Sequence, residues 1–156
     1  MKRRPVAVLD ACVLVPMPLA DTLLRLAEPP ALFAARWTDE ILVEVTRTLV
    51  GRFGKSPEKA SYRETAMREF FPDSLIHQYE QLIPRMENHP KDRHVLAAAV
   101  ACKADSVVTF NLKDFSATSA QKCQVAVIGP STFLRDIWTL DQLAVERKGT
   151  GIAVRK

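Results

Sequence analysis

The sequence contains few cysteines and no apolar stretch of the length that a membrane helix needs. Cysteine occurs three times in 156 residues, at positions 12, 102 and 123, and never as a CxxC pair. That number and spacing fit neither a disulfide framework nor a zinc ribbon, so we expect free thiols and a cytoplasmic protein. The basic start MKRR leads into an apolar run that Asp10 interrupts. We therefore expect neither a secretion signal nor a membrane span, which takes about 20 apolar residues.

Histidine is equally sparse, and the three histidines form no metal-binding motif. His77, His89 and His94 show neither HxxxH nor HExxH spacing, which argues against zinc hydrolase chemistry. The sequence has no internal repeat and no low-complexity segment. Hydrophobic residues make up 47% and charged residues 26%, which is typical of a globular domain. The net charge of +4 is compatible with a polyanionic partner but does not demonstrate one.

Short apolar runs alternate with amphipathic segments along the chain. PVAVL, ALFAARW, SVVTFN and QVAVIGP are typical of buried strands. Helices are expected over 20–28, after the capping residue Thr38, after Ser56, in an alanine-rich segment that follows residue 90, and from 131. Residues 74–83 fit either a short helix or a strand with a turn. The alternation predicts an α/β fold, a three-layer α/β/α sandwich with a central parallel sheet. We expect one domain over 1–146 and a loosely ordered basic tail over 147–156.

Polar side chains follow two of the predicted strands. Asp10 ends the first apolar run, and Asn111 and Asp114 follow SVVTF. Ligands of parallel sheets bind beyond the carboxyl ends of the strands, so these side chains should share one edge. An unpaired buried carboxylate is costly, and Asp10 must therefore be neutralised, paired or bound to a metal.

Two more acids lie on predicted helices. Glu44 lies at the border of an apolar helix face, and Asp92 precedes Val95, Leu96 and Ala99 at helical spacing, in line with the buried face. Each has an ordinary explanation alone, an exposed helix glutamate for Glu44 and a helix cap for Asp92. Together with the strand-end acids they predict a cluster whose mutual repulsion a divalent cation would relieve.

Three stretches taken in order resemble a known family. They are VLDACVL, WTDEILVEVTRTL and NHPKDRHVLAAAVACKADSVVTFNLKDF, and the resemblance runs from about residue 5 to about residue 135. The sequence is similar to the PIN-domain ribonucleases, and within them to the VapC-like toxin components of bacterial toxin–antitoxin systems. The resemblance implies an endoribonuclease that cleaves single-stranded RNA with Mg²⁺ or Mn²⁺, and a homodimer with a cognate antitoxin protein.

The resemblance also implies roles for individual residues. The metal ligands and catalytic acids would be Asp10, Glu44, Asp92 and Asp114. Thr109 and Asn111 would support them through hydrogen bonds, and Arg93 and His94 are candidates for contacts with RNA. Asn111 and Asp114 both fall in the last motif, and we favour Asp114 as the acid. Many relatives carry asparagine or serine two positions after the first aspartate, whereas this chain carries Cys12.

Two other functions fit parts of the pattern. A metal-dependent phosphatase also places an aspartate after the first strand, but the haloacid type would have DxD where this chain has Asp-Ala-Cys. A non-catalytic PIN-like module that binds nucleic acid or protein would need no complete set of acids. The predicted helix over 56–71 carries an apolar stripe of Tyr62, Ala66 and Phe70, which we expect to form core or a dimer interface.

Overall fold

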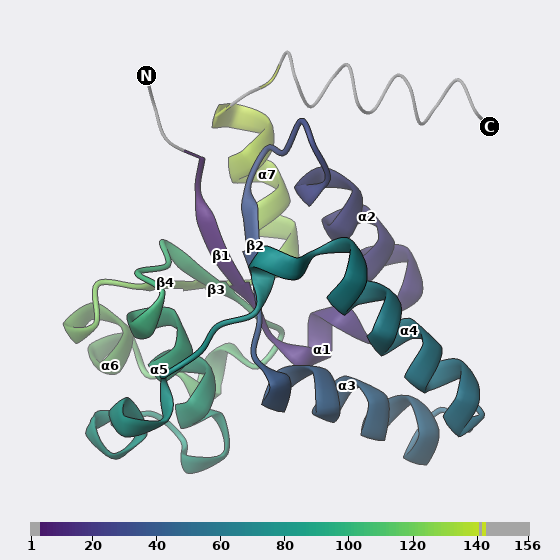
Figure 1. The fold of residues 1–156 in the computed structure, drawn as a ribbon. Helices are drawn as coiled ribbons and strands as arrows, with labels where there is room; N and C mark the ends of the chain where they lie inside the picture. The colour runs from purple at the N-terminus through teal and green to yellow at the C-terminus, as the bar shows by residue number, and fades with distance from the viewer. Residues whose placement is uncertain (1–3, 141, 143–156) are drawn as a thin grey trace.

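The computed structural model describes residues 4–140 and 142, and these residues form a four-stranded parallel sheet between helices (Figure 1). The strand order is β2-β1-β3-β4, so the first strand is central. The strands are β1 (Val6–Leu9), β2 (Ala34–Arg36), β3 (Ser106–Val108) and β4 (Ala126–Ile128). The predicted α/β sandwich with a central parallel sheet is therefore confirmed. The tail over 147–156 lies outside the described residues.

Helices cover the sheet from both sides. In Figure 1, α5 and α6 lie to the left of the strands, and α2, α3 and α4 lie to the right. The α-helices are α1 (Ala11–Leu14), α2 (Met17–Ala27), α3 (Asp39–Gly51), α4 (Pro57–Phe70), α5 (Arg93–Ala101), α6 (Ala117–Lys122) and α7 (Pro130–Leu140). Single 3₁₀ turns are η1 (Pro72–Ser74), η2 (Glu80–Arg85), η3 (Pro90–Asp92) and η4 (Leu112–Asp114). Among the described residues, no helix is both long enough and apolar enough to cross a bilayer.

The two central strands are buried on both faces, which explains their uninterrupted apolar sequences. Ala7, Val8, Leu9, Val107 and Val108 are all 0% exposed. The register pairs Leu9 with Val108. Because parallel strands end at the same edge, the residues that follow, at positions 10 and 109, are brought together.

Thr38 and Ser56 cap α3 and α4 as predicted. The Thr38 hydroxyl accepts the Ile41 N–H at 3.0 Å, and the Ser56 hydroxyl accepts the Lys59 N–H at 3.2 Å. Each bond satisfies one of the backbone donors that the first turn of a helix leaves without a partner. Thr38 is 0% exposed, so water cannot replace its hydroxyl.

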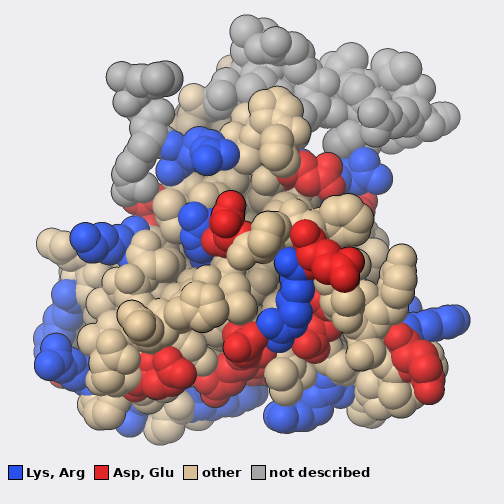
Figure 2. All heavy atoms as spheres, viewed as in Figure 1, with Lys and Arg blue, Asp and Glu red and all other residues tan. Residues whose placement is uncertain are grey.

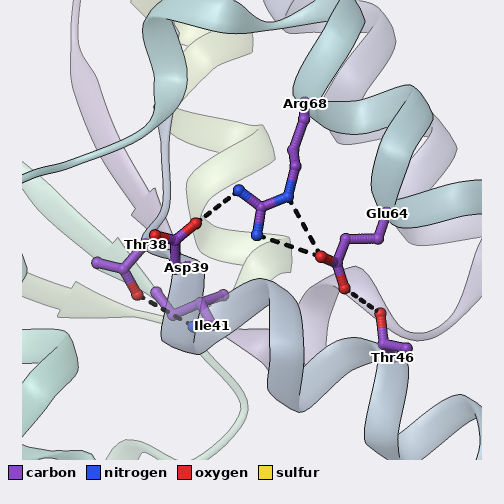
Figure 3. A network of polar contacts seen from close by, with 6 residues as sticks. All are labelled: Thr38, Asp39, Ile41, Thr46, Glu64 and Arg68. Atoms are coloured by element: carbon purple, nitrogen blue, oxygen red, sulfur yellow. Dashed lines mark hydrogen bonds and ion pairs between the residues drawn. The ribbon is translucent and has the colours of Figure 1, made fainter. Parts of the chain in front are cut away.

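Helix α4 holds α3 through a polar network (Figure 3). The Arg68 guanidinium donates to Asp39 at 2.5 Å and to Glu64 at 3.2 Å. Glu64 in turn accepts the hydroxyl proton of Thr46 at 2.6 Å. Asp39 lies at the start of α3 and Thr46 seven residues further along, so the network fixes two points on this helix.

Helix α4 also contacts α1, through a different arginine. The Arg63 guanidinium donates to the main-chain oxygens of Leu14 and Val15, at the carboxyl end of α1. These carbonyls lack partners within the short helix, and a cation suits the negative end of its dipole. Helix α4 thus braces both helices that begin near the carboxyl ends of β1 and β2.

Several sequence predictions need correction. The first long helix begins at Met17 rather than at residue 20, because Pro18 is tolerated in a first turn, and α1 was not predicted. The second strand has three residues instead of seven. The ambiguous segment 74–83 forms one parallel bridge, Leu75 with Trp37, followed by η2.

The apolar stripe on α4 is not core. Tyr62 and Phe70 are 77% and 78% exposed, while Ala60 and Met67 are the buried residues of this helix. The spacing of the stripe was helical, but spacing alone does not say which helix face meets the sheet. The alternative reading of this stripe, a dimer interface, stays a prediction.

Replacing Thr38 by valine keeps the side-chain shape but removes the cap. We expect Thr38→Val to lower the free energy of unfolding by about 1–2 kcal/mol, because the buried Ile41 N–H loses its acceptor. Urea denaturation of both proteins measures the difference. Thr22→Val is the control, since the exposed Thr22 hydroxyl bonds only the Pro18 carbonyl of its own helix. Equal losses of unfolding free energy in Thr38→Val and Thr22→Val would contradict the role of Thr38 as the buried cap of α3.

Candidate functional site

Asp10 lies at the carboxyl end of β1, where the chain turns directly into α1. Its side chain is 2% exposed. One carboxylate oxygen, Oδ1, accepts the Ala11 N–H at 2.8 Å, and the other, Oδ2, accepts the Thr109 hydroxyl proton at 2.8 Å. The Asp10 N–H donates to the Val108 carbonyl at 3.1 Å, which continues the ladder between β1 and β3. Among the residues that the structure describes, the carboxylate is held by these hydrogen bonds and forms no ion pair.

The turn after β3 brings three of the predicted residues to the same edge. Thr109 is 0% exposed, and its oxygen accepts the Asn111 N–H at 3.0 Å. Asp114 ends η4, its N–H donates to the Asn111 carbonyl, and its own carbonyl accepts the His89 N–H, both at 3.0 Å. The main chain of this turn is therefore tied both to β1 and to the loop that precedes α5.

Asp92 lies at the junction of η3 and α5, in the position of a helix cap. It makes no capping hydrogen bond from its side chain, so the ordinary explanation for an aspartate here does not apply. The residue is 2% exposed, and its Oδ2 atom has no hydrogen-bond partner. Burial, the charge of Asp10, and the hydrogen bond and charge of Asp114 together raise the pKa of Asp92 to about 7. Asp92 is thus an acid whose ionised form the protein alone stabilises poorly.

Glu44 faces the same group from α3. Burial raises the pKa of Glu44 and the charge of Asp10 raises it further, while His94, Lys91 and Arg47 oppose the shift. The predicted border position on the helix therefore places this carboxyl half-buried and within electrostatic reach of Asp10. Asp10, Glu44, Asp92 and Asp114 are called the acidic site below.

The two candidates for RNA contacts make internal contacts. The Arg93 Nε–H donates to the Asn88 carbonyl at 2.8 Å. His94 is 7% exposed, its Nδ1 lies 3.7 Å from Glu40 Oε1, and this nitrogen has no hydrogen-bond partner. The same glutamate oxygen accepts the hydroxyl proton of Tyr79 at 2.9 Å. The charge of His94 also lowers the pKa of Glu44, so His94 lies within electrostatic reach of one member of the acidic site.

Lys91 is a residue that the sequence did not single out. It is exposed, and its charge lowers the pKa values of both Asp92 and Glu44, so it lies within electrostatic reach of two members of the acidic site. Its position next to Asp92 in NHPKD was the available signal. Cys12, which the sequence marked only as a departure from the family pattern, also lies at this edge, because its sulfur contacts Thr109 and Asp10.

The donor set fits a hard divalent cation that keeps part of its hydration. Carboxylate oxygens are the ligands that Mg²⁺ and Mn²⁺ prefer, and the orphaned Oδ2 atom of Asp92 is such an oxygen. Within residues 4–140 and 142, no three His, Cys, Asp or Glu side chains are close enough together to enclose an ion. The arrangement therefore suits a cation held by few carboxylates and completed by water or substrate oxygens.

The sheet and the acids at its carboxyl edge define an α/β protein with an acidic strand-edge site. The chain is similar to a curated protein described as "Putative ribonuclease VapC50" from Mycobacterium tuberculosis (strain ATCC 25618 / H37Rv), with 44% identity over 72 residues. The match covers 46% of this chain, and it spans 40% of the length of that relative. No family model matches the sequence.

The raised pKa of Asp92 predicts how the stability of the metal-free protein, kept in EDTA, depends on pH. Folded protein holds a proton on Asp92 between about pH 4 and pH 7 that the unfolded chain has lost, so the free energy of unfolding falls as pH rises through this range. In Asp92→Asn we expect the free energy of unfolding to fall less over this pH range, by on the order of 2 kcal/mol, because the titrating carboxyl is gone. Urea denaturation across the range measures it.

The control for this experiment is Asp73→Asn, which neutralises an exposed aspartate in η1. Its pH dependence should follow that of the wild type. An Asp92→Asn curve parallel to the wild-type curve would show that Asp92 is ionised in the folded protein across the whole range.

Proposed function

We propose that this chain is a divalent-cation-dependent endoribonuclease that cleaves single-stranded RNA, acting as the toxin of a toxin–antitoxin pair. The observation that carries the proposal is Asp92, a buried acid with an orphaned oxygen and a pKa near 7, next to two further acids. Such an arrangement destabilises a protein unless a cation binds to it. The name of the similar protein from Mycobacterium tuberculosis supports the choice of ribonuclease.

Asp10, Asp92 and Asp114 would hold Mg²⁺ or Mn²⁺, at most two of them directly and the rest through bound water. Glu44 beside them would be a further water-mediated ligand or the group that orients the attacking water. The cation supplies water activation and stabilisation of the leaving oxygen when it is bound. The Thr109 hydroxyl keeps the Asp10 carboxylate oriented through a buried bond of 2.8 Å. A bound cation also lowers the pKa of Asp92, so that this carboxyl is ionised at neutral pH.

Binding of the RNA backbone needs positive charge beside the acids, and Lys91 is placed to supply it. Its ammonium group is exposed and reaches two members of the acidic site electrostatically. On the face in Figure 2, basic and acidic side chains are interspersed. We therefore propose local phosphate contacts near Lys91 rather than a broad basic surface.

Removal of either buried aspartate should abolish cleavage. We expect Asp10→Asn and Asp92→Asn to slow cleavage of a single-stranded RNA oligonucleotide at least about 100-fold, because each loses a ligand charge at the cation. EDTA should stop the wild-type reaction, and added Mn²⁺ should restore it. Gel analysis of end-labelled RNA measures the rates, with Glu69→Gln, an exposed acid on α4, as the control.

The competing functions give different results in the same assay. Wild-type protein that binds RNA without cleaving it would be a non-catalytic PIN-like module. Hydrolysis of a phosphate monoester but not of RNA would point to a phosphatase. Cleavage that persists in EDTA, or equal rates in wild type and both aspartate variants, would refute the proposed mechanism.

We further propose that the chain forms a homodimer and binds a cognate antitoxin protein, as the resemblance implies. The exposed aromatic rings of Tyr62 and Phe70 on α4 support a protein interface, because large apolar side chains are seldom exposed together without a partner. Phe70 also borders a cavity of about 190 Å³ between α2 and α4.

A double substitution on α4 tests the dimer. We expect wild type to sediment as a dimer and Tyr62→Ser with Phe70→Ser to sediment as a monomer, because the exposed stripe would no longer be apolar. Analytical ultracentrifugation distinguishes the two. The control is Phe53→Ser, which removes a 58% exposed aromatic ring just beyond α3. A monomeric wild type would show that the chain forms no dimer. A double variant that remains dimeric would show that the dimer interface lies elsewhere.

A further inference from the structure

Cys12 connects two segments that lie far apart in the sequence. It belongs to α1, and its sulfur accepts the Phe110 N–H at 3.3 Å. The same sulfur lies 3.4 Å from Thr109 Oγ1 and 3.8 Å from Asp10 Oδ2. The side chain therefore spans the gap between the start of α1 and the turn that follows β3.

The direction of these hydrogen bonds follows from counting protons. The Thr109 hydroxyl has a single proton, and at 2.8 Å the Asp10 carboxylate is its strongest acceptor. The Thr109 oxygen also accepts the Asn111 N–H. The thiol therefore acts as a donor toward these oxygens, with Thr109 Oγ1 at 3.4 Å and Asp10 Oδ2 at 3.8 Å as the two acceptors within its reach.

We propose that Cys12 is a positioning residue of the acidic site, holding the turn at 109–111 in place against Asp10. The effect of Cys12 on cation binding rests on the proposed function, in which the acidic site holds a cation. The sulfur holds the main chain at Phe110 while the Thr109 oxygen holds it at Asn111, and this turn leads to Asp114. The thiol also lies 3.4 Å from the hydroxyl that orients Asp10 and 3.8 Å from the Asp10 carboxylate itself.

The geometry distinguishes the side chains that can occupy position 12. A side chain here must accept an N–H from one partner and donate to a hydroxyl oxygen on another. Serine has both capacities but a shorter bond from carbon to the polar atom, so it reaches both partners less well. Alanine has neither capacity. Cys12→Ser should therefore retain part of the effect that Cys12→Ala loses.

Amide hydrogen exchange, measured by NMR on metal-free protein, tests the first half of the proposal. We expect Cys12→Ala to speed exchange of the Phe110 amide about 10-fold, corresponding to one lost hydrogen bond, and Cys12→Ser to give an intermediate rate. The Leu82 amide, which donates to the Tyr79 carbonyl in η2, is the internal reference. Cys102→Ala is the matched control, because the partly buried Cys102 thiol donates to the Ala99 carbonyl of the helix that it caps.

Calorimetric titration with Mn²⁺ tests the second half. We expect Cys12→Ala to weaken Mn²⁺ binding about 10-fold, the usual size of the effect when a group behind a ligand is lost. Cys12→Ser should recover affinity to within about 3-fold of wild type, and Cys102→Ala should match wild type. A change in the rate of RNA cleavage is not needed for either measurement.

Each outcome decides a separate question. Unchanged Phe110 exchange in Cys12→Ala would overturn the proposal. Faster exchange with unchanged Mn²⁺ affinity would reduce Cys12 to a structural residue, and would also overturn it. Cation binding that depends on Cys12 in a protein that does not cleave RNA would refute the proposed function and leave the positioning role intact. Wild type that binds no Mn²⁺ would refute both the function and the role of Cys12 toward the cation.

Discussion

The arrangement of the site depends on one buried hydrogen bond, from the Thr109 hydroxyl to the Asp10 carboxylate, across 99 positions of sequence. It exists because β1 and β3 are adjacent and parallel, so that both end at the same edge. Within the described part of the chain the oxygens of Asp10 are satisfied by the Thr109 hydroxyl and the Ala11 amide rather than by a cationic side chain. Every other member of the acidic site is placed relative to this fixed carboxylate.

The second constraint is electrostatic, and it opposes stability. The protein buries Asp92 near Asp10 and Asp114 and leaves one of its oxygens without a partner, which raises the pKa of Asp92 to about 7. The network from Arg68 to Asp39 and Glu64 ties α4 to α3, the helix that carries Glu44. Local strain in a rigid frame is typical of functional sites, where stability is given up for chemistry.

Sequence reasoning succeeded where a local signal and the tertiary structure agree. Uninterrupted apolar runs marked the buried strands, and Thr38 and Ser56 marked helix starts, because a cap acts within three residues. It failed where packing decides. Tyr62 and Phe70 have helical spacing yet face outward, and the position of Lys91 beside two acids follows from how the loop before α5 folds back. Asp92 had an equally good local explanation as a cap, which only the three-dimensional structure removed.

The sequence by itself determined the class of fold and marked Asp10 as a charge that needs a partner, since alternating apolar runs specify a parallel sheet and an unpaired carboxylate in such a run is costly. Tertiary structure decided which of these groups meet and how strongly they perturb one another. Cys12 illustrates the difference: in the sequence it is only a departure from the family that the chain resembles, and in the structure its sulfur accepts the Phe110 N–H in the turn whose Thr109 hydroxyl holds Asp10. Distances between residues about 100 positions apart are set by strand register and burial, and neither is encoded in a local pattern.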